Sequence, residues 1–294
     1  MKFEMKNHLK PCATVSAVII VIALVMSMMG MGMNLGIDFT GGTLMTYNMG
    51  AEFSVDEVKA ALAACGVAEA QIAKTGEDNT QVQIRIADVE NTDDLRDALV
   101  ENLSASYPAI EYVDITRVGA VVGGELINNA IKSLTLAAVL MLVYIAFRFD
   151  LYSGLAAIIG LVHDVAIMMS FVVILRSFIR VETTFIAALL TIVGYSINNT
   201  IIIFDRIREN SHKPGVRQLP REQIVNLSVT ESLPRTINTT ITTLLTVVTL
   251  YILGVDSIKQ FALPLIIGMV AGVYSANLIN GYVWALLMDM RKKA

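Results

Sequence analysis

Six long apolar stretches, separated by polar segments, dominate the hydrophobic pattern of this chain. They cover residues 12–33, 126–147, 151–175, 183–204, 236–255 and 260–288. About twenty consecutive apolar residues in helical conformation cross the hydrocarbon core of a bilayer, and every stretch reaches that length. The pattern therefore predicts six membrane-spanning helices. The first stretch is too long and too uniformly apolar for a signal-peptide core, so we expect it to be retained.

A different pattern occupies residues 34–125, where short segments replace the long apolar stretches. Residues 80–87 alternate, with Val82, Ile84 and Ile86 on one face and polar side chains on the other, which predicts a half-buried strand. Three further strands are expected at residues 43–48, 72–74 and 110–118, and two helices are expected after Ser54 and Asn91. The order βαββαβ predicts a ferredoxin-like α+β domain, with two helices on one face of a four-stranded antiparallel sheet.

Local signals predict the ends of the two helices in this domain. Ser54 and Glu57 have the spacing of a capping box, in which each side chain accepts a hydrogen bond from the other residue's backbone N–H. Gly66 is typical of the residue that follows a helix end, because glycine adopts left-handed backbone angles without strain. Asn91 is expected to cap the second helix, whose leucines recur at a spacing of four residues.

Composition agrees with a membrane protein. Hydrophobic residues make up 55% of the chain, charged residues only 16%, and the mean hydropathy is +0.63. Soluble domains carry about a quarter charged residues, so this composition excludes an ordinary soluble domain.

Lysine and arginine residues predict the orientation of the spans, because short cytoplasmic loops carry an excess of them. These residues precede the first span, gather in residues 205–235 and follow the sixth span, so we expect both termini and this loop to be cytoplasmic. Residues 1–33 then form the N-terminus and first helix, and residues 126–294 form the rest of the bundle. Residues 34–125, with 16 acidic and 5 basic residues, are expected outside a plasma membrane. Because the basic residues are spread over separate membrane edges, no nucleic-acid partner is predicted.

The cysteines and histidines predict neither a disulfide nor a metal site. The expected topology places Cys12 and Cys65 on opposite sides of the membrane, so they cannot pair with each other. His8, His163 and His212 lie far apart in the chain, and no spacing typical of metal ligands connects them. We therefore predict no metal and no cofactor.

Polar side chains interrupt the fourth apolar stretch. Ser196, Asn198, Asn199 and Thr200 lie close together within it, and charged residues begin at Asp205, where the helix is expected to leave the membrane. Polar groups in hydrocarbon need partners, so such clusters usually face the interior of a helix bundle. They are either polar contacts between packed helices or part of a route for ions, and the sequence leaves both interpretations open.

The third apolar stretch contains a histidine and a carboxylate, His163 and Asp164. At ~1.5 Å of rise per residue they lie roughly 18 Å into the span, near the membrane midplane. Such residues are costly there unless they are paired or hydrated. They are either a proton-accepting pair or a structural tie that holds the third span against its neighbours. Arg235 is a further charged candidate at the start of the fifth span, whose threonine stripe faces either another helix or a hydrated route.

Two motifs carry a resemblance to a known family. Gly36-Ile-Asp-Phe-Thr-Gly-Gly42 follows the first span, and Gly194-Tyr-Ser-Ile-Asn198 is followed by Phe204-Asp-Arg-Ile-Arg-Glu-Asn210 around the end of the fourth. Both resemble signature segments of SecF, the six-helix subunit of the SecD–SecF protein-export complex, and the resemblance covers the whole chain. Residues of the family motifs that are expected to have structural roles are Gly36, Asp38, Phe39, Gly41, Gly42, Gly194, Tyr195, Asp205, Arg206, Glu209, Gly268 and Gly272.

The resemblance implies a half bundle of the resistance-nodulation-division (RND) type. It also implies a SecD-like partner, a SecYEG-type translocon and a role in preprotein export that is driven by ion flow. One departure concerns Asn199, because SecF usually has an aspartate there that is thought to take part in ion coupling. Asparagine cannot titrate, but it can form hydrogen bonds or coordinate a cation. The ion-coupling candidates are Asn199, Asp164, His163, Arg235, Ser196 and Asn198.

Two other functional classes remain open at this point. One is a stand-alone RND-type exporter of lipids or small hydrophobic molecules, which would work without a second six-helix subunit. The other is an intramembrane hydrolase built on Ser196 with His163 and Asp164. The strand-turn-helix elbow that exposes a serine nucleophile is missing around Ser196, so we predict that the protein is not an enzyme.

Overall fold

The computed structural model describes residues 5–67, 70–76, 78–87 and 91–293. The chain forms two compact units. One consists of Leu35–Asn129, which we call the outer domain, and the other combines Met1–Asn34 with Ala130–Ala294, which we call the bundle. The two units are described separately below.

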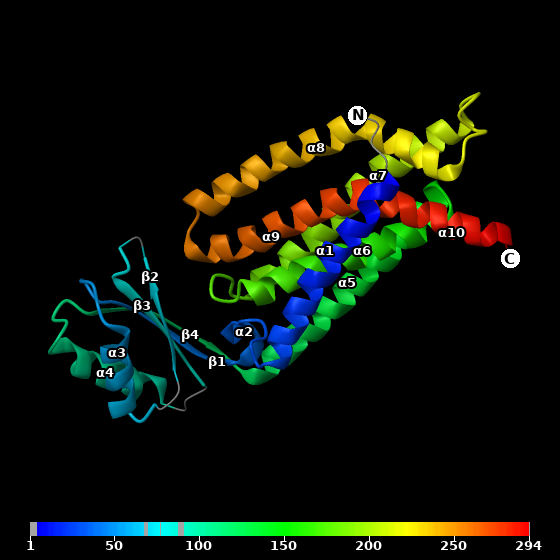
Figure 1. The fold of residues 1–294 in the computed structure, drawn as a ribbon. Helices are drawn as coiled ribbons and strands as arrows, with labels where there is room; N and C mark the ends of the chain where they lie inside the picture. Colours follow the sequence, from blue (N-terminus) through cyan, green and yellow to red (C-terminus); the bar gives the residue numbers. More distant parts are fainter. Residues whose placement is uncertain (1–4, 68–69, 77, 88–90, 294) are drawn as a thin grey trace. The chain divides into compact units, whose positions relative to one another are not determined.

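The outer domain contains a four-stranded sheet and two main helices (Figure 1). Every strand pair is antiparallel and the strand order is β2-β3-β1-β4, which is the ferredoxin-like arrangement expected from the βαββαβ order. Buried side chains of β1, β3 and both helices form one apolar core, which includes Met45, Leu62, Ile84 and Leu99. The elements are α2 (Ile37–Thr40), β1 (Gly42–Asn48), α3 (Val55–Ala64), β2 (Gln71–Thr75), β3 (Gln81–Ile86), α4 (Thr92–Ser104) and β4 (Glu111–Val118).

A tyrosine replaces the predicted capping box at the start of α3. Ser54 is the N-cap residue as expected, but its side chain makes no capping hydrogen bond. Instead the Ser54 backbone N–H donates to the Tyr107 hydroxyl at 3.3 Å, and that hydroxyl donates to the Glu57 carboxylate. The predicted capping box is therefore wrong, because the Tyr107 hydroxyl, from the segment after α4, bonds to both the Ser54 N–H and the Glu57 carboxylate. Asn91 likewise precedes α4 without a side-chain capping bond.

Glycines of the first motif allow close backbone contacts at the start of β1. Gly41 and Gly42 have φ values of 71° and 124°, a region that other residues rarely adopt. A Cβ at Gly42 would lie 2.5 Å from the Ile86 carbonyl oxygen, and one at Gly123 would lie 2.3 Å from the Phe39 carbonyl oxygen. The positive φ angles of Gly41 and Gly42 and the close contact at Gly42 explain why the motif has two adjacent glycines, and Gly123 is glycine because it packs on the backbone of Phe39.

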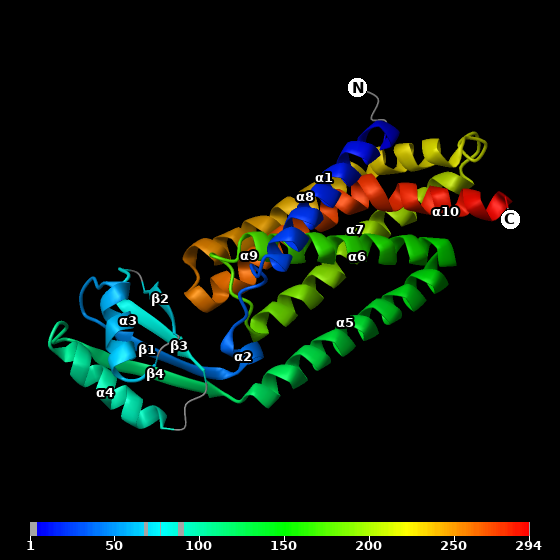
Figure 2. The same ribbon diagram turned by 60° about the horizontal axis from the view of Figure 1, so that its bottom comes forward.

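The bundle contains six helices that are long and apolar enough to cross a membrane, as the hydrophobic pattern predicts. The last span is continuous but changes form, since α9 passes through a five-residue π-helix, η1, into α10. Figures 1 and 2 show α1 lying alongside α6. The elements are α1 (Met5–Met28), α5 (Ala120–Arg148), α6 (Leu151–Ile174), α7 (Thr183–His212), α8 (Arg221–Leu253), α9 (Asp256–Ser275), η1 (Ala276–Asn280) and α10 (Gly281–Lys293).

The segment expected as a cytoplasmic loop, residues 205–235, is mostly helical. Helix α7 continues to His212 and α8 begins at Arg221, so only residues 213–220 lack helical structure. The charges there are held between the two helices, since Arg206 bonds to Glu231 at 2.6 Å. The last part of this segment and the fifth span therefore belong to a single helix, α8.

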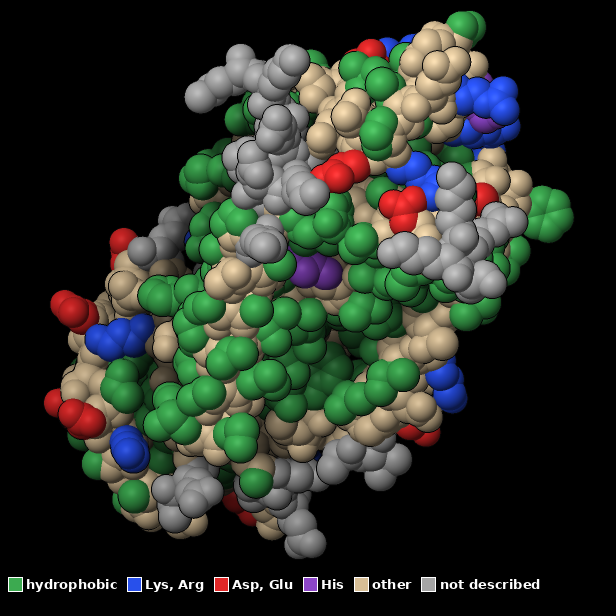
Figure 3. All heavy atoms as spheres, turned by 45° about the vertical axis from the view of Figure 1, so that its right-hand side comes forward, with side chains coloured by type: hydrophobic (Ala, Val, Ile, Leu, Met, Phe, Trp, Pro, Cys, Tyr) green, Lys and Arg blue, Asp and Glu red, His purple; other side chains and the backbone are tan. Residues whose placement is uncertain are grey.

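The outer surfaces of several spans are apolar and uncovered. Only 6% of the apolar window of α5 and 11% of that of α1 are buried, against 50% for α6. Figure 3 shows a broad field of hydrophobic side chains on one face. Such a surface is suited to lipid tails or to another membrane helix.

Candidate functional site

Asp164 is a buried carboxyl group that is hydrogen-bonded by side chains of α6, α7 and α9. It lies on α6, its side chain is 0% exposed, and α6 packs against α1, α7 and α9. The Ser196 hydroxyl of α7 and the Ser275 hydroxyl of α9 both donate to its Oδ2 atom, at 2.5 and 2.7 Å. Its Oδ1 atom lies 3.0 Å from His163 Nδ1. Both carboxylate oxygens are thus paired, which is the condition for keeping a carboxylate inside a membrane span.

A hydrogen-bonded chain continues from the carboxylate toward α1. His163 Nε2 lies 2.8 Å from the Ser16 hydroxyl, and that hydroxyl lies 3.2 Å from the hydroxyl of Tyr274 on α9. The rings of His163 and Tyr274 are also close, with centroids 5.8 Å apart. Four polar side chains from three helices therefore form one continuous line from Asp164 to Tyr274. We call Asp164, His163, Ser16 and Tyr274 the polar relay.

The polar relay has two complete hydrogen-bonding patterns. With Asp164 ionised, His163 donates from Nδ1 to the carboxylate, and a neutral ring then accepts from Ser16 at Nε2. When the ring is protonated, Nε2 donates to Ser16 instead, and Ser16 in turn donates to Tyr274. Each pattern pairs every member, so a proton arriving from the Tyr274 side reverses the chain without leaving an unpaired group. This is the arrangement needed to pass a proton to a partly buried imidazole.

Glycines bring the helices close enough for these bonds. A Cβ at Gly268 would lie 2.2 Å from Ile192 Cδ1, and one at Gly272 would lie 3.2 Å from the Ser196 Cα and Cβ atoms. Gly268 and Gly272, four residues apart, therefore let α9 pack directly on α7, as small-xxx-small motifs do in membrane helices. This close approach allows Ser196 and Ser275 to reach the same carboxylate oxygen.

Asn199 lies inside the bundle without a partner. Its side chain is 0% exposed, and neither Oδ1 nor Nδ2 has a hydrogen-bond partner among the described residues. Further along α7, by contrast, the Asn210 side chain bonds to the Ser228 hydroxyl of α8 at 3.0 Å. The Thr240 hydroxyl is also buried without a partner in the described chain. Such groups are usually satisfied by water or an ion.

Two predicted candidates lie outside this interior. The side chains of Asn198 and Arg235 are exposed on the bundle surface, and neither forms a hydrogen bond or ion pair with a described residue. Asn198 thus does not share the face of Ser196 and Asn199, because neighbouring helix positions point about 100° apart. Exposed polar groups on a membrane span indicate contact with something outside this chain.

Other buried polar contacts could not be assigned from sequence patterns. Asn277 in η1 accepts from Thr236 of α8 at 3.1 Å, and Asn280 donates to Thr200 of α7 at 2.7 Å. A Cβ at Gly160 of α6 would fall on the Asn280 side chain, so glycine makes room for that amide. Asn277 and Asn280 lie within the sixth apolar stretch, but no sequence pattern predicts the π-helix in which both amides are buried. Ser16, Tyr274 and Ser275 were likewise missed as members of the site.

Four charged side chains form an ion-pair network where α7 meets α8, and we call them the clasp: Arg206, Glu209, Lys213 and Glu231. Arg206 contacts Glu209 and Glu231, and Lys213 pairs with Glu209 at 3.1 Å. Asp205 pairs instead with Arg148 of α5 at 3.3 Å. Nothing in the described structure explains glycine at Gly194, since a Cβ there would meet no atom within 4 Å. The hydroxyl of Tyr195 is buried without a described partner.

The geometry does not support a hydrolase built on Ser196. Its hydroxyl donates directly to Asp164 rather than to His163, so the serine–histidine contact of a catalytic triad is absent at Ser196. The serine beside His163 is Ser16, which lies within the regular helix α1 and offers no neighbouring backbone donors for an oxyanion. Among the described residues, no group of three or more His, Cys, Asp or Glu side chains is placed to hold a metal ion.

Comparison with known proteins connects these features to protein export. Residues 99–290 match the family described as Protein export membrane protein SecD/SecF, C-terminal, and residues 27–49 match the SecD/SecF GG motif. The chain is 37% identical over 268 residues to Protein translocase subunit SecF of Desulfurispirillum indicum, which covers 89% of this chain and 84% of that protein. It is 33% identical over 296 residues to the SecF of Acidaminococcus fermentans, covering 99% of each chain.

Solved structures show the same relationship. The crystal structure of SecDF from Thermus thermophilus, described as a translocon-associated membrane protein, matches with a TM-score of 0.79 at 33% identity. That match covers 100% of this chain and 39% of the SecDF chain, so this chain spans about two fifths of SecDF. A second SecDF structure, in a super-membrane-facing form, matches with a TM-score of 0.69 at 31% identity.

Proposed function

Because this chain belongs to the SecD/SecF family of protein export membrane proteins, we propose that it is a SecF-type accessory subunit that couples ion flow to preprotein export. The observation that carries this proposal is the polar relay, in which a fully buried carboxylate is joined through a histidine to two hydroxyl groups. The relatives named SecF favour this role over that of a stand-alone exporter of small molecules. The work of the subunit is conformational rather than enzymatic.

In this proposal protons enter at Tyr274 and reach His163 through Ser16. The imidazolium that forms lies 3.0 Å from Asp164, so the negative carboxylate stabilises it inside the membrane. Protonation also reverses the bond between His163 and Ser16, which alters the contact between α6 and α1. A change in that contact is a local switch that helix movement can follow.

A SecD-like subunit is the proposed partner. The polar side chains of Asn198 and Arg235 project from the bundle surface, and α5 is almost uncovered. Polar groups on an outer surface are unstable against lipid and are satisfied by a second polar helix. SecDF, which this chain matches over 39% of its length, is a single chain that is long enough to supply such a second half. SecYEG and the translocating preprotein are the further partners that this role requires.

The proposed membrane is the plasma membrane, with both termini cytoplasmic and the outer domain on the opposite side. Lysines and arginines before α1, around the clasp and after α10 support this orientation through the positive-inside rule. A cysteine placed at Gln81 is expected to react with a membrane-impermeant thiol reagent in whole cells. A cysteine at Lys213 is expected to react only after lysis, and the reverse pattern would contradict the orientation.

The decisive experiment replaces Asp164 by Asn in the intact export complex. This change keeps the shape and the acceptor oxygen for the serines but removes the charge that stabilises a protonated His163. We expect the ion-driven stimulation of export to fall to the level seen without this subunit, while the complex still assembles. Proton uptake into inverted vesicles and copurification of the partner measure the two properties separately.

Ser170 supplies a matched control on the same helix. It is also buried, but among the described residues its hydroxyl bonds only to the Ala166 carbonyl of its own helix, so Ser170→Ala should leave stimulation unchanged. Ser16→Ala removes the link between His163 and Tyr274 and should slow proton uptake without removing Asp164. A normal stimulated rate in Asp164→Asn would refute the relay and assign proton transfer to the partner.

Asn199 is proposed to position water or a cation rather than to titrate. Its unpartnered amide supplies a neutral oxygen ligand. Asn199→Asp should therefore change the dependence of export on Na⁺ relative to H⁺. An unchanged rate and ion preference would show that Asn199 is a packing residue.

A further inference from the structure

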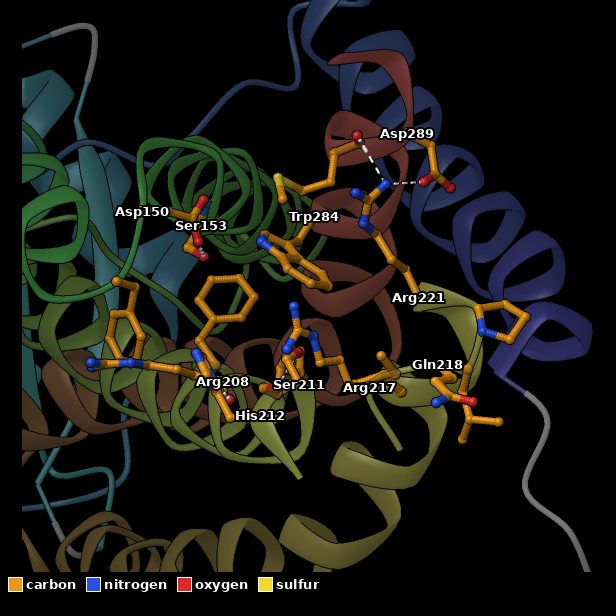
Figure 4. A pocket seen from close by; sticks show the side chains of 17 residues that line it. Asp150, Ser153, Arg208, Ser211, His212, Arg217, Gln218, Arg221, Trp284 and Asp289 are labelled. Carbon is orange, nitrogen blue, oxygen red and sulfur yellow. Dashed lines mark hydrogen bonds and ion pairs between the residues drawn. The ribbon is translucent and has the colours of Figure 1, made fainter. Parts of the chain in front are cut away.

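A cavity of about 740 Å³ lies at the end of the bundle where α7 turns into α8, away from the polar relay. It is bordered by the turn between α5 and α6, by the segment between α7 and α8, and by α10. Four basic side chains line it, namely Arg208, His212, Arg217 and Arg221 (Figure 4). We call this cavity the basic pocket.

The positive charge of the basic pocket is only partly neutralised. Arg221 pairs with Asp289 of α10, but no described carboxylate pairs with Arg208 or Arg217. Arg208 donates only to the Arg148 backbone carbonyl, at 3.1 Å. The other acid at the pocket is Asp150, which accepts hydrogen bonds from the backbone N–H and the hydroxyl of Ser153 and so caps α6. Two guanidinium groups thus remain available to an anion.

Two further features supply hydrogen-bond donors to the basic pocket, namely the indole N–H of Trp284 and the N-terminus of α8. Trp284 is only 7% exposed and lines the pocket, and its indole Nε1 has no hydrogen-bond partner among the described residues. Figure 4 shows its nitrogen-bearing edge turned into the space between α6 and α7. Helix α8, which is 33 residues long, begins at the pocket with no side-chain cap at Pro220. An uncapped helix N-terminus carries partial positive charge and free N–H donors.

The pocket also has an apolar wall that a free inorganic anion would not use. Phe204, Ile207 and Trp284 line it from α7 and α10, and all three are buried apolar side chains of the bundle. The basic rim lies beyond Asp205, where charged residues begin after the apolar part of α7. A ligand that satisfies both parts must carry a negative group at the membrane surface and an apolar portion below it. This is the chemistry of a phospholipid with a net negative charge.

We propose that the basic pocket binds the phosphate-bearing headgroup of an anionic phospholipid. Arg217 and Arg208 contact the phosphate, because guanidinium groups match phosphate oxygens in pairs. The Trp284 N–H supplies a further donor, and the aromatic side chains contact the glycerol and upper acyl region. A bound lipid then connects α7, α8 and α10 at the end of the bundle that holds the clasp.

The test measures lipid binding by the full chain in detergent micelles, with native mass spectrometry counting bound phosphatidylglycerol. The Arg217 side chain is exposed and forms no hydrogen bond or ion pair with a described residue, so Arg217→Gln should fold normally. We expect it to bind phosphatidylglycerol about fivefold more weakly, the effect of removing one basic residue from a lipid surface. Trp284→Phe keeps the ring and loses the N–H, and it should weaken binding by a smaller factor.

Arg176 gives a matched control, because it follows α6 at the opposite end of the bundle and its side chain also lacks a described partner. Arg176→Gln should bind phosphatidylglycerol like the unmodified chain. Equal binding by the Arg217→Gln variant, or equal binding of zwitterionic phosphatidylcholine, would overturn the proposal. Displacement of the lipid by inorganic phosphate at the same concentration would reassign the pocket to free anions. Because the readout is lipid binding, its result is independent of the role in export.

Discussion

The outer domain buries apolar side chains between its sheet and two helices, whereas the bundle buries a carboxylate, amides and hydroxyls between helices with apolar outer surfaces. In the first, core residues such as Met45, Val58 and Leu99 are 0% exposed, and Arg85 is the one described charged side chain that is buried. In the second, Asp164 and Asn199 are 0% exposed near the middle of their spans. The same chain thus follows two opposite rules for its interior.

The difference shows how the surrounding medium decides what an interior is for. Water solvates the polar side chains of the outer domain, so folding places apolar groups inside and stability comes from their burial. Lipid cannot solvate polar groups, so the bundle gains little by hiding apolar side chains and keeps polar ones where other polar groups meet them. We infer that the outer domain's core serves stability, whereas the bundle's core serves function. The predictions below test this contrast, beginning with the largest expected effect.

Truncation of an outer-domain core residue should have the largest effect on stability. Leu99 is 0% exposed on α4, and Leu99→Ala removes buried methyl groups from a packed core. We expect a loss of ~2–5 kcal/mol in the free energy of unfolding of this domain. Hydrogen exchange of β1 and β3 measures the loss. Val113 on β4 is 50% exposed, so Val113→Ala should change protection little, and equal losses in both variants would contradict the assigned core.

A methyl group added between α7 and α9 should have the next largest effect. Gly268→Ala places its Cβ against the fully buried Ile192, and the crowding should destabilise the bundle by ~1–3 kcal/mol. Gly194→Ala adds the same group on the same pair of helices, but it meets no atom within 4 Å. Thermal unfolding of the purified protein in detergent distinguishes the two. If both variants unfold at the same temperature, the close approach at Gly268 does not support the bundle.

Removing the unpartnered amide should stabilise the bundle slightly. Asn199→Leu replaces a buried group that has no described hydrogen bond, so we expect a gain of about 1 kcal/mol. Asn280→Leu removes the bond to Thr200 and should destabilise by a similar amount. Opposite shifts in the midpoint of chemical unfolding would indicate that Asn199 is kept for function at a cost in stability. A loss in both variants would show that Asn199 has a structural role.

The smallest effect concerns high pH and is confined to the outer domain. Burial raises the pKa of Tyr47 above its ordinary value of about 10, because the folded domain disfavours the charged phenolate. The folded state then holds its proton more tightly than the unfolded state, so this stabilisation is present below pH about 10 and is lost as pH rises further. The protection of the β1 amides against hydrogen exchange should therefore weaken above that pH. Tyr47→Phe should remove the dependence, and its persistence in that variant would contradict the role of Tyr47.

Much of the architecture followed from the sequence alone. Six spans, the βαββαβ order of the outer domain and the depth of His163 and Asp164 were all predicted, and the structure agrees on the spans and the fold. The physical reason is that apolar length and side-chain periodicity are local properties. Each stretch carries its own information about whether it crosses a bilayer or lies half-buried in a sheet.

Only the tertiary structure decided which polar groups meet. Ser16 and Tyr274 lie 258 positions apart in the chain, yet they are neighbours in the polar relay, while Asn198 faces away from Asn199 beside it. Tyr107 likewise took the place of a local capping box at Ser54. Periodicity determines which residues share a helix face, but not which helix that face contacts. That choice depends on how closely the helices approach, which is set by glycines and side-chain shapes distant in sequence.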